Sequence, residues 1–275
     1  MHTQHTGRTL RYQFDSLFAL GEYINDTPRT WANNQSRTSS MHFNMNASYD
    51  DAVRYAREGW LEGAKLLETE LQALPQATPY PTLRNDFYGH MPHVARYCAG
   101  APDNMIRHAQ VADKISGRVL TLYVPINALG GVSAKAMSNF GLAVAHYVNQ
   151  LEMTGTRVEL YAVQCSLVSG YRTTHTWRVK SAEQPLDLAV IAFTIGHPAM
   201  FRRLGFALRE RCDAPQDIAY GKTVALTLDD LIYPAPGAFI LNGMRNADTL
   251  AYSKATALAY VGEQIDRAMN DPEAA

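Results

Sequence analysis

Cysteine is scarce in this chain of 275 residues, with three copies at Cys98, Cys165 and Cys212. Their number is odd, they lie far apart, and none belongs to a C-x-x-C pair, which excludes a disulfide framework. This usage is typical of proteins in a reducing compartment. We therefore expect a cytoplasmic protein without structural disulfides.

Long apolar runs are also missing. The longest, such as Leu188–Ile195, have the length of a strand and fall far short of the roughly 20 residues of a membrane-spanning helix. The first residues, Met1–Leu10, are polar and lack the apolar segment of a secretory signal. These absences predict a protein that neither crosses a membrane nor is exported.

A charge excess of either sign is absent as well. Lys and Arg number 25 and Asp and Glu number 26, which gives a net charge of -1. This balance provides no overall attraction towards nucleic acid or an anionic membrane. Apolar material, in contrast, is plentiful, because 47% of residues are hydrophobic and 19% are charged. The chain can therefore form a sizeable core.

The first part of the chain, residues 1–115, predicts an α+β extension packed on that core. Thr9–Phe14 alternates loosely and predicts a short edge strand, and Asp15 is expected to cap the helix that follows. A second helix begins at Ser48 with a spacing close to that of a capping box, and its apolar face places Trp60 in the core. Loops and a linker are expected at Thr27–Ser40, Pro75–Pro81 and Asn85–Asp113.

From residue 116 to residue 275, predicted strands alternate with predicted helices. This order favours parallel βαβ units in a Rossmann-like, three-layer α/β sandwich. The third strand follows the second too closely for a crossover helix and should run antiparallel at an edge. The expected strands are Arg118–Ile126, Arg157–Leu167, Thr173–Lys180, Leu186–Ile195 and Ala238–Leu241, and the expected helices are Ser133–Met153, Pro198–Arg211 and Thr249–Met269.

The order strand, long helix, strand, short antiparallel strand, strand, helix resembles the von Willebrand factor A fold. Three segments are also similar to an uncharacterised family encoded by bacteriophages and mobile elements: Ser48–Gly63, Val94–Met105 and His197–Glu210. The resemblance implies a phage or prophage origin, and a place in the host cytoplasm or in the virion. It implies no reaction, because none is attached to that family.

Metal binding in a von Willebrand A domain depends on Asp-x-Ser-x-Ser after the first strand. Here Asn127 stands where the carboxylate would be, and the two hydroxyls are missing at the required spacing. We therefore expect no metal and no other cofactor at this position. Gly130 and Gly131 precede a helix and would suit a phosphate, although two glycines in a simple turn are the commoner explanation.

Two further groups of residues have the chemistry of a site. His90, His93 and Cys98 are residue types that bind zinc, but a second close pair is missing, and a packing cysteine in an ordinary loop is the simpler explanation. His197, Arg202 and Arg203 follow a predicted strand, where open α/β sheets place ligands. They would bind an anion or a partner, with at least one arginine facing outward; the alternative is a helix cap with structural arginines.

The loop that contains Arg29, Trp31 and Arg37 mixes an indole with two cations. This composition suits stacking and backbone contact with single-stranded nucleic acid. It also suits a solvated loop whose tryptophan packs against the core. Both interpretations stay open at the level of the sequence.

These observations favour a non-catalytic interaction or structural protein of phage origin, built on a metal-free von Willebrand A-like domain. Its partner would be another protein or a second copy of the chain. The second hypothesis is a nucleic-acid-associated protein of phage replication, carried by the Trp31 loop and by Arg202 and Arg203. The third is an enzyme with a site at the strand ends near Asn127 and His197, completed by Asp187 or Asp248.

Overall fold

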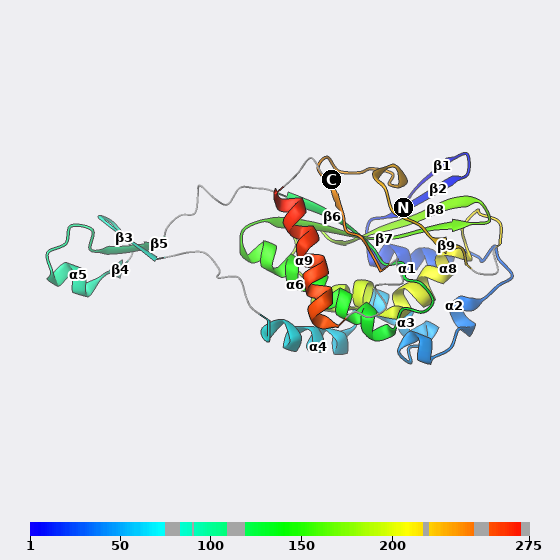
Figure 1. The fold of residues 1–275 in the computed structure, drawn as a ribbon, viewed down its shortest axis with the longest axis horizontal. Coiled ribbons are helices and arrows are strands. Elements are labelled where there is room, and N and C mark those ends of the chain that lie inside the picture. Colours follow the sequence, from blue (N-terminus) through cyan, green and yellow to red (C-terminus); the bar gives the residue numbers. More distant parts are fainter. Residues whose placement is uncertain (75–82, 90, 109–118, 217–219, 245–252, 271–275) are drawn as a thin grey trace.

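The computed structural model describes residues 1–74, 83–89, 91–108, 119–216, 220–244 and 253–270. Its main feature is a mixed sheet with the strand order β1-β2-β8-β7-β6-β10, in which β9 also pairs with β7 (Figure 1). The strands are β1 (His2–Thr6), β2 (Thr9–Phe14), β6 (Val119–Pro125), β7 (Arg157–Val168), β8 (Tyr171–Lys180), β9 (Lys222–Thr223) and β10 (Phe239–Ile240).

The centre of the sheet follows the expected βαβ plan. Strands β6 and β7 are parallel and are joined by the long helix α6 (Ala134–Met153), while β10 lies parallel to β6 on its other side. Strand β8 runs antiparallel to β7, as its short connection predicts. Numbered from β6 in chain order and leaving out β9, the order β8-β7-β6-β10 reads 3-2-1-4, with β8 antiparallel to the other three strands. The mixed α/β fold is therefore confirmed.

The positions of two strands differ from expectation. Strand β2 is not at an edge, because it pairs with β8 on one side and with β1 on the other. Strand β8 is consequently enclosed as well, and Trp177 on it is fully buried. Two strands from the region before residue 115 thus belong to the main sheet.

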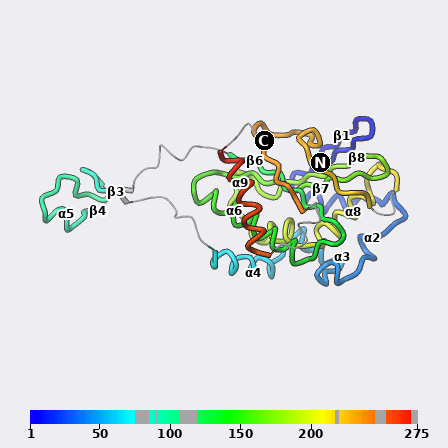
Figure 2. The backbone as a smooth tube through the Cα atoms, in the orientation of Figure 1, coloured from blue at the N-terminus to red at the C-terminus, as the bar shows by residue number. Residues whose placement is uncertain are grey.

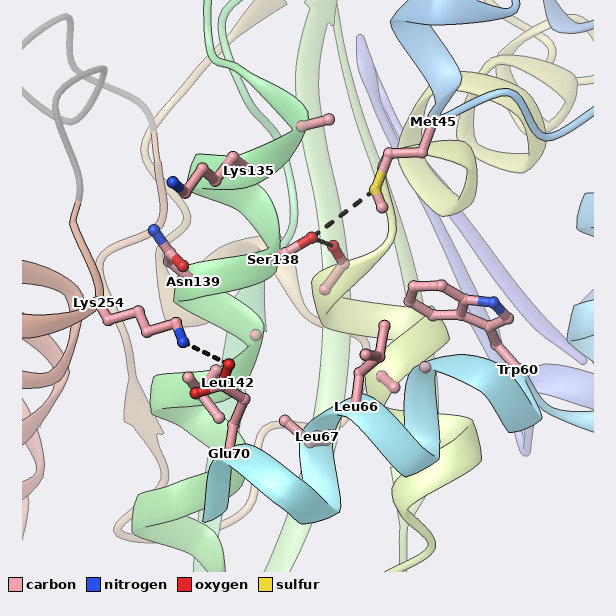
Figure 3. Close-up of a pocket in the computed structure, with 15 residues that line it drawn as sticks. Met45, Trp60, Leu66, Leu67, Glu70, Lys135, Ser138, Asn139, Leu142 and Lys254 are labelled. Atoms are coloured by element: carbon pink, nitrogen blue, oxygen red, sulfur yellow. Dashed lines mark hydrogen bonds and ion pairs between the residues drawn. The ribbon is translucent and has the colours of Figure 1, made fainter. Parts of the chain in front are cut away.

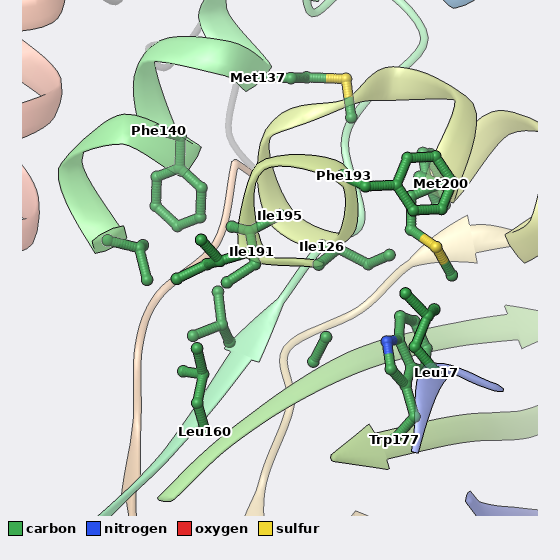
Figure 4. Packing of buried hydrophobic residues seen from close by; sticks show 14 of the residues in the cluster. Leu17, Ile126, Met137, Phe140, Leu160, Trp177, Ile191, Phe193, Ile195 and Met200 are labelled. Carbon is green, nitrogen blue, oxygen red and sulfur yellow. The ribbon is translucent and has the colours of Figure 1, made fainter. Parts of the chain in front are cut away.

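The two faces of the sheet are covered differently. Helices pack on one face, where Phe140, Trp177 and Phe193 are part of the larger core (Figure 4). On the other face, Tyr123, Val163 and Cys165 lie under the irregular segment of residues 224–240 and form a smaller cluster with it. Before strand β10 begins at Phe239, the described part of this segment contains one 3-10 turn, η5 (Leu228–Asp230), and it forms the third layer.

Local sequence signals place several helices as predicted. Ser133 caps α6, since its hydroxyl accepts the N–H of Ala136 at 3.1 Å. Ser48 and Asp51 form a reciprocal capping box at the start of α3 (Tyr49–Glu58). The expected single helix from Ser48 breaks at Gly59, whose φ is +78°, and continues as α4 (Leu61–Gln72). Three more helices are α1 (Leu17–Asp26), α2 (Gln35–Thr38), which interrupts the expected loop, and α9 (Lys254–Asn270).

Two details of the prediction are wrong. The cap of α1 is Ser16 rather than Asp15, because the Ser16 hydroxyl accepts the N–H of Ala19. Leu186–Ile195 is not a central strand but a helix, α7 (Leu188–Ile191), followed by a π-helical segment, η3 (Ala192–Gly196). Asp187 starts this helix by accepting the N–H groups of Ala189 and Val190. A short run in which only Asp187 and Thr194 are polar fits a buried helix as well as a buried strand.

The expected helix Pro198–Arg211 is wound unevenly. It consists of the π-helical segment η4 (Met200–Gly205) and one α-helical turn, α8 (Phe206–Arg209). π-helical turns are rare in proteins, and those that occur are often found at functional sites. Both π segments lie next to residues that the sequence singles out, since His197 separates them and η4 contains Arg202 and Arg203.

Residues 83–108 form a second, small sheet with the order β3-β5-β4 (Figure 2). It was predicted as an ordered loop with short elements, and the linker predicted at Pro75–Pro81 lies outside the described residues. Its elements are β3 (Leu83–Asp86), β4 (Met91–Pro92), α5 (Val94–Cys98) and β5 (Met105–His108).

Candidate functional site

An apolar recess with a volume of about 350 Å³ lies between α4, α6 and η3 (Figure 3). We call it the α4–α6 pocket. Its walls are mostly apolar, with a few polar groups near the edge. The main lining residues are Met45, Trp60, Gly63, Leu66, Leu67, Glu70, Lys135, Ser138, Gly141, Leu142, Gly196 and Lys254.

Trp60 is held at one end of this pocket by backbone and ring contacts. Its backbone N–H donates to the carbonyl of Ala189 at 3.1 Å. Its indole ring stands edge-on to the ring of His197, with 4.5 Å between the ring centroids. Gly63 leaves room for the indole, because a Cβ at that position would lie 2.0 Å from the Trp60 ring. Trp60 is half-buried, so it contributes to the core and to the pocket wall at once.

The outer part of the pocket exposes apolar side chains to water. Leu66 is 63% exposed, and Met45 is 38% exposed. Leu67, the next residue on α4, is buried in the core. The edge carries an ion pair between Glu70 and Lys254 (Figure 3). A contiguous exposed apolar patch, rather than a single exposed leucine, is typical of surfaces that bind other molecules, and here Leu66, Met45 and the recess line one pocket.

Ser138 is the hydroxyl group inside the pocket. It donates to the carbonyl of Gly196 at 3.2 Å and also contacts the sulfur of Met45 at 3.7 Å. Neither partner is a base that would activate a hydroxyl as a nucleophile. Ser138 is therefore not arranged as a nucleophile, and the walls around it are mostly apolar.

His197 is buried and acts as a helix cap. Its Nδ1 accepts the N–H of Ala199 at 3.0 Å, and the rings of Tyr55, Trp60 and Phe193 surround it. Burial lowers the pKa of His197 to about 4, and the nearby Asp51 opposes this shift. The imidazole is thus neutral at pH 7 and holds no positive charge for an anion.

Arg202 and Arg203 are both buried, at 1% exposure each, so the expectation that one of them faces outward is wrong. The segment of residues 36–47 folds over them. Arg203 donates to the carbonyls of Ala47 and Ser36 and to the hydroxyl of Ser39 at 3.0–3.3 Å. It therefore braces this segment against η4.

Arg202 reaches the opposite side of the same segment. It donates to the carbonyls of Phe43 at 2.7 Å and Val132 at 2.6 Å, and its guanidinium stacks on the Phe43 ring at 3.6 Å. Burial lowers the pKa of Arg202 to about 10, which still leaves it charged at pH 7. The carbonyl of Val132 belongs to the turn before α6, so Arg202 connects η4 with the start of that helix.

Asn127 fastens the loop after β6 to the neighbouring strand. Its amide donates to the carbonyl of Cys165 and accepts the N–H of the same residue, both at 2.8 Å. Asp187, proposed as its acidic partner, caps α7. Among the described residues no hydrogen bond joins Asn127, His197 and Asp187, and Asp248 lies outside them.

The residues of the proposed nucleic-acid loop do not form one surface. Trp31 is 4% exposed and donates its indole N–H to the carbonyl of Ala214 at 2.9 Å. Arg29 donates to the carbonyl of Asn33, and Arg37 lies over the Tyr49 ring with 4.1 Å to its centroid. The Trp31 ring is thus packed in the core and is not available for stacking on a base.

The residues of the proposed zinc loop have local contacts. His93 caps α5 by accepting the N–H of Arg96 through Nδ1, and Cys98 is an exposed free thiol. His90 lies outside the described residues. In the part of the chain that the structure describes, no group of three or more His, Cys, Asp or Glu side chains has the geometry of a metal site.

The α4–α6 pocket was not predicted from the sequence. The adjacent leucines Leu66 and Leu67 on α4 give no signal for it, because neighbouring positions of an amphipathic helix can both lie on its apolar face. The exposure of Leu66 is therefore known from the structure alone. The other walls come from α6, η3 and α9, and no sequence pattern brings these segments together.

The architecture is that of a mixed α/β protein with an apolar recess on its helical side. The chain belongs to a family described as Domain of unknown function (DUF7192), whose model matches residues 2–258. Comparisons with curated proteins and with solved structures give no match. Among the described residues, no helix has the length and apolar character needed to cross a membrane.

Proposed function

We propose that this chain is a non-catalytic binding protein and that the α4–α6 pocket receives apolar side chains of a protein partner. The observation that carries the proposal is the position of Leu66, 63% exposed at the edge of a recess of about 350 Å³. Together with Met45 and Trp60 it offers apolar contact area without a reactive group in place.

The shape and the charges at the edge favour a protein segment over a small apolar molecule. The recess is open along α4, so apolar surface continues from its inner wall to the exposed Leu66 (Figure 3). Glu70 and Lys254 offer one charge of each sign at the edge. A polar rim around an apolar centre is the usual arrangement of a protein–protein interface.

The von Willebrand A-like fold and the phage origin belong to the same proposal. The series β6, α6, β7 and antiparallel β8 supports the fold. The strand that this resemblance requires next is β10, because Leu186–Ile195 is helical. The segments Ser48–Gly63, Val94–Met105 and His197–Glu210 support kinship with proteins of phages and mobile elements, and hence a place in the host cytoplasm or the virion.

The two other hypotheses receive less support. The nucleic-acid hypothesis depends on Trp31, whose ring is buried. The enzyme hypothesis depends on convergence of Asn127 and His197. Asn127 instead makes its hydrogen bonds with the backbone of Cys165, and His197 with that of Ala199.

A peptide-display selection tests the proposal. A library of random helical peptides is panned against the protein, and the affinity of enriched peptides is measured for the wild type and for two matched variants. Leu66→Glu places a charge at the edge of the pocket and should weaken binding at least tenfold. Leu61→Glu is the control, because Leu61 is equally exposed on α4, at 62%, but does not line the pocket.

Enriched peptides should carry large apolar residues at helical spacing and should bind the Leu61→Glu variant like the wild type. If no peptide is enriched, or if binding is the same for both variants, the pocket is not an interaction site and the proposal fails.

A further inference from the structure

A second cleft, of about 500 Å³, lies at the start of α6 and is distinct in chemistry from the α4–α6 pocket. We call it the Arg202 cleft. It is lined by the first turn of α6, by the segment of residues 42–46 and by Arg202. We propose that this cleft binds the phosphate group of a phosphomonoester ligand.

The first observation is the buried charge of Arg202. Its side chain is 1% exposed, and its Nε has no hydrogen-bond partner within the described part of the chain. Its other nitrogens donate to carbonyl oxygens, which carry no net charge. Within the described residues no carboxylate pairs with Arg202, and the Phe43 ring on which its guanidinium stacks carries no net charge. A buried cation without a counter-ion is unfavourable, and a bound anion would supply one.

The second observation is the electrostatics of α6, a helix of 20 residues. The N-terminus of a long helix carries a partial positive charge, and acidic side chains usually stand there. The first turn of α6 contains no acidic residue and has Lys135 instead. Among the described residues Lys135 forms no ion pair. Three positive groups thus favour a bound anion in the cleft: the N-terminus of α6, Lys135 and Arg202.

The third observation concerns hydrogen-bond donors. The Ser133 hydroxyl caps the N–H of Ala136, which leaves the N–H groups of Ala134 and Lys135 without an intrahelical acceptor. Ser133 itself is exposed in the cleft. Two backbone N–H groups and an ammonium in one helical turn match the several acceptor oxygens of a phosphate.

The lining of the cleft differs from the chain as a whole. The complete sequence is balanced, with 25 basic and 26 acidic residues. The lining contains His42, Lys135 and Arg202 and no aspartate or glutamate. The positive groups of the lining attract a dianionic phosphate monoester more strongly than a monoanionic carboxylate or phosphodiester. The volume of the cleft fits a small molecule.

Isothermal titration with phenyl phosphate tests the assignment in the full-length protein. Binding is measured for the wild type and for Ser133→Asp, Lys135→Ala and Lys65→Ala. Aspartate is a good N-cap, so Ser133→Asp should preserve or raise the melting temperature while its carboxylate repels the phosphate and abolishes binding. Lys135→Ala should weaken binding about tenfold, and Lys65→Ala, an exposed lysine on α4, should leave it unchanged.

Two comparison ligands separate the possible sources of the anion. Benzoate offers a carboxylate on the same ring, and a single-stranded oligonucleotide without terminal phosphates offers phosphodiesters. Both should bind at least tenfold more weakly than phenyl phosphate. The proposal is overturned if phenyl phosphate does not bind at millimolar concentration, if Ser133→Asp binds it normally, or if either comparison ligand binds as tightly.

Discussion

Gly141 on α6 and Gly196 at the end of η3 lie so close together that a Cβ on Gly141 would stand 2.4 Å from the Cα of Gly196. The contact is between backbones, so no flexible side chain can move away. Gly141→Ala should therefore destabilise the protein by about 1–3 kcal/mol, although alanine by itself favours a helix.

Chemical denaturation of Gly141→Ala measures this effect, and Gly21→Ala is the matched control. Gly21 is also helical, but a Cβ there would meet its nearest neighbour, Ala56, at 3.8 Å, an ordinary contact. That variant should gain up to about 1 kcal/mol. Equal behaviour of the two variants would show that α6 and η3 are packed less tightly than described.

Arg203→Met should destabilise the protein by about 2–4 kcal/mol, because it leaves the buried carbonyls of Ala47 and Ser36 without donors. Urea unfolding provides the measurement. Arg57→Ala is the control: Arg57 is exposed and pairs with Glu22 at 2.9 Å, so its loss should change stability by about 0.5 kcal/mol or less. A loss for Arg203→Met as small as that of the control would mean that Arg203 does not brace the segment.

Trp60→Ala should cost about 2 kcal/mol, less than the roughly 3–5 kcal/mol of a fully buried tryptophan. The reason is that Trp60 is half-buried: it packs against His197 and Tyr55 on one side and lines the α4–α6 pocket on the other. Differential scanning calorimetry of this variant checks the value. An unchanged melting temperature would indicate that the ring makes no stabilising contact.

The stability of the protein should fall as the pH falls from about 6.5 to about 4. In the folded state burial lowers the pKa of His197 to about 4, whereas an unfolded histidine titrates near 6.5. Between these values the unfolded state binds more protons, so the stabilisation is present above pH 6.5 and is lost on acidification, by about 3 kcal/mol at most.

Urea unfolding at several pH values between 4 and 8 measures this loss. His197→Asn retains an acceptor for the Ala199 N–H but cannot be protonated, so its stability should depend less on pH in that window. Parallel pH profiles for the variant and the wild type would contradict the prediction. His175, whose pKa burial lowers to about 3, accounts for a further pH-dependent part in both proteins.

Cys98 should be the one cysteine that reacts quickly with a thiol reagent in the native protein. It is exposed, whereas Cys165 and Cys212 are buried and burial raises the pKa of each thiol to about 11. The thiolate is the reactive form, so the buried groups should react on unfolding. Counting labelled thiols with and without denaturant tests this, and Cys98→Ser should abolish the fast reaction.

Much of the fold could be predicted from local signals. The capping serines Ser48 and Ser133 and the apolar periodicity behind them place α3 and α6, because a cap and the first helical turn are neighbours in the sequence. The antiparallel direction of β8 follows from its short connection to β7. Where a residue interacts with partners a few positions away, the sequence contains both sides of the interaction.

Other features depend on segments that are far apart in the chain. Leu186–Ile195 is apolar except at Asp187 and Thr194, and such a run has no periodicity to separate helix from strand; the surrounding α6 and α4 and the cap at Asp187 decide it. Arg202 and Arg203 look like surface residues until the segment of residues 36–47, more than 150 positions earlier, supplies the carbonyls that let them be buried. The sequence by itself determined the starts of α3 and α6 and the α/β class through contacts between near neighbours. The burial of the arginines, the π-helical segments and both candidate pockets were decided by long-range packing, because their walls come from segments that meet only in the folded chain.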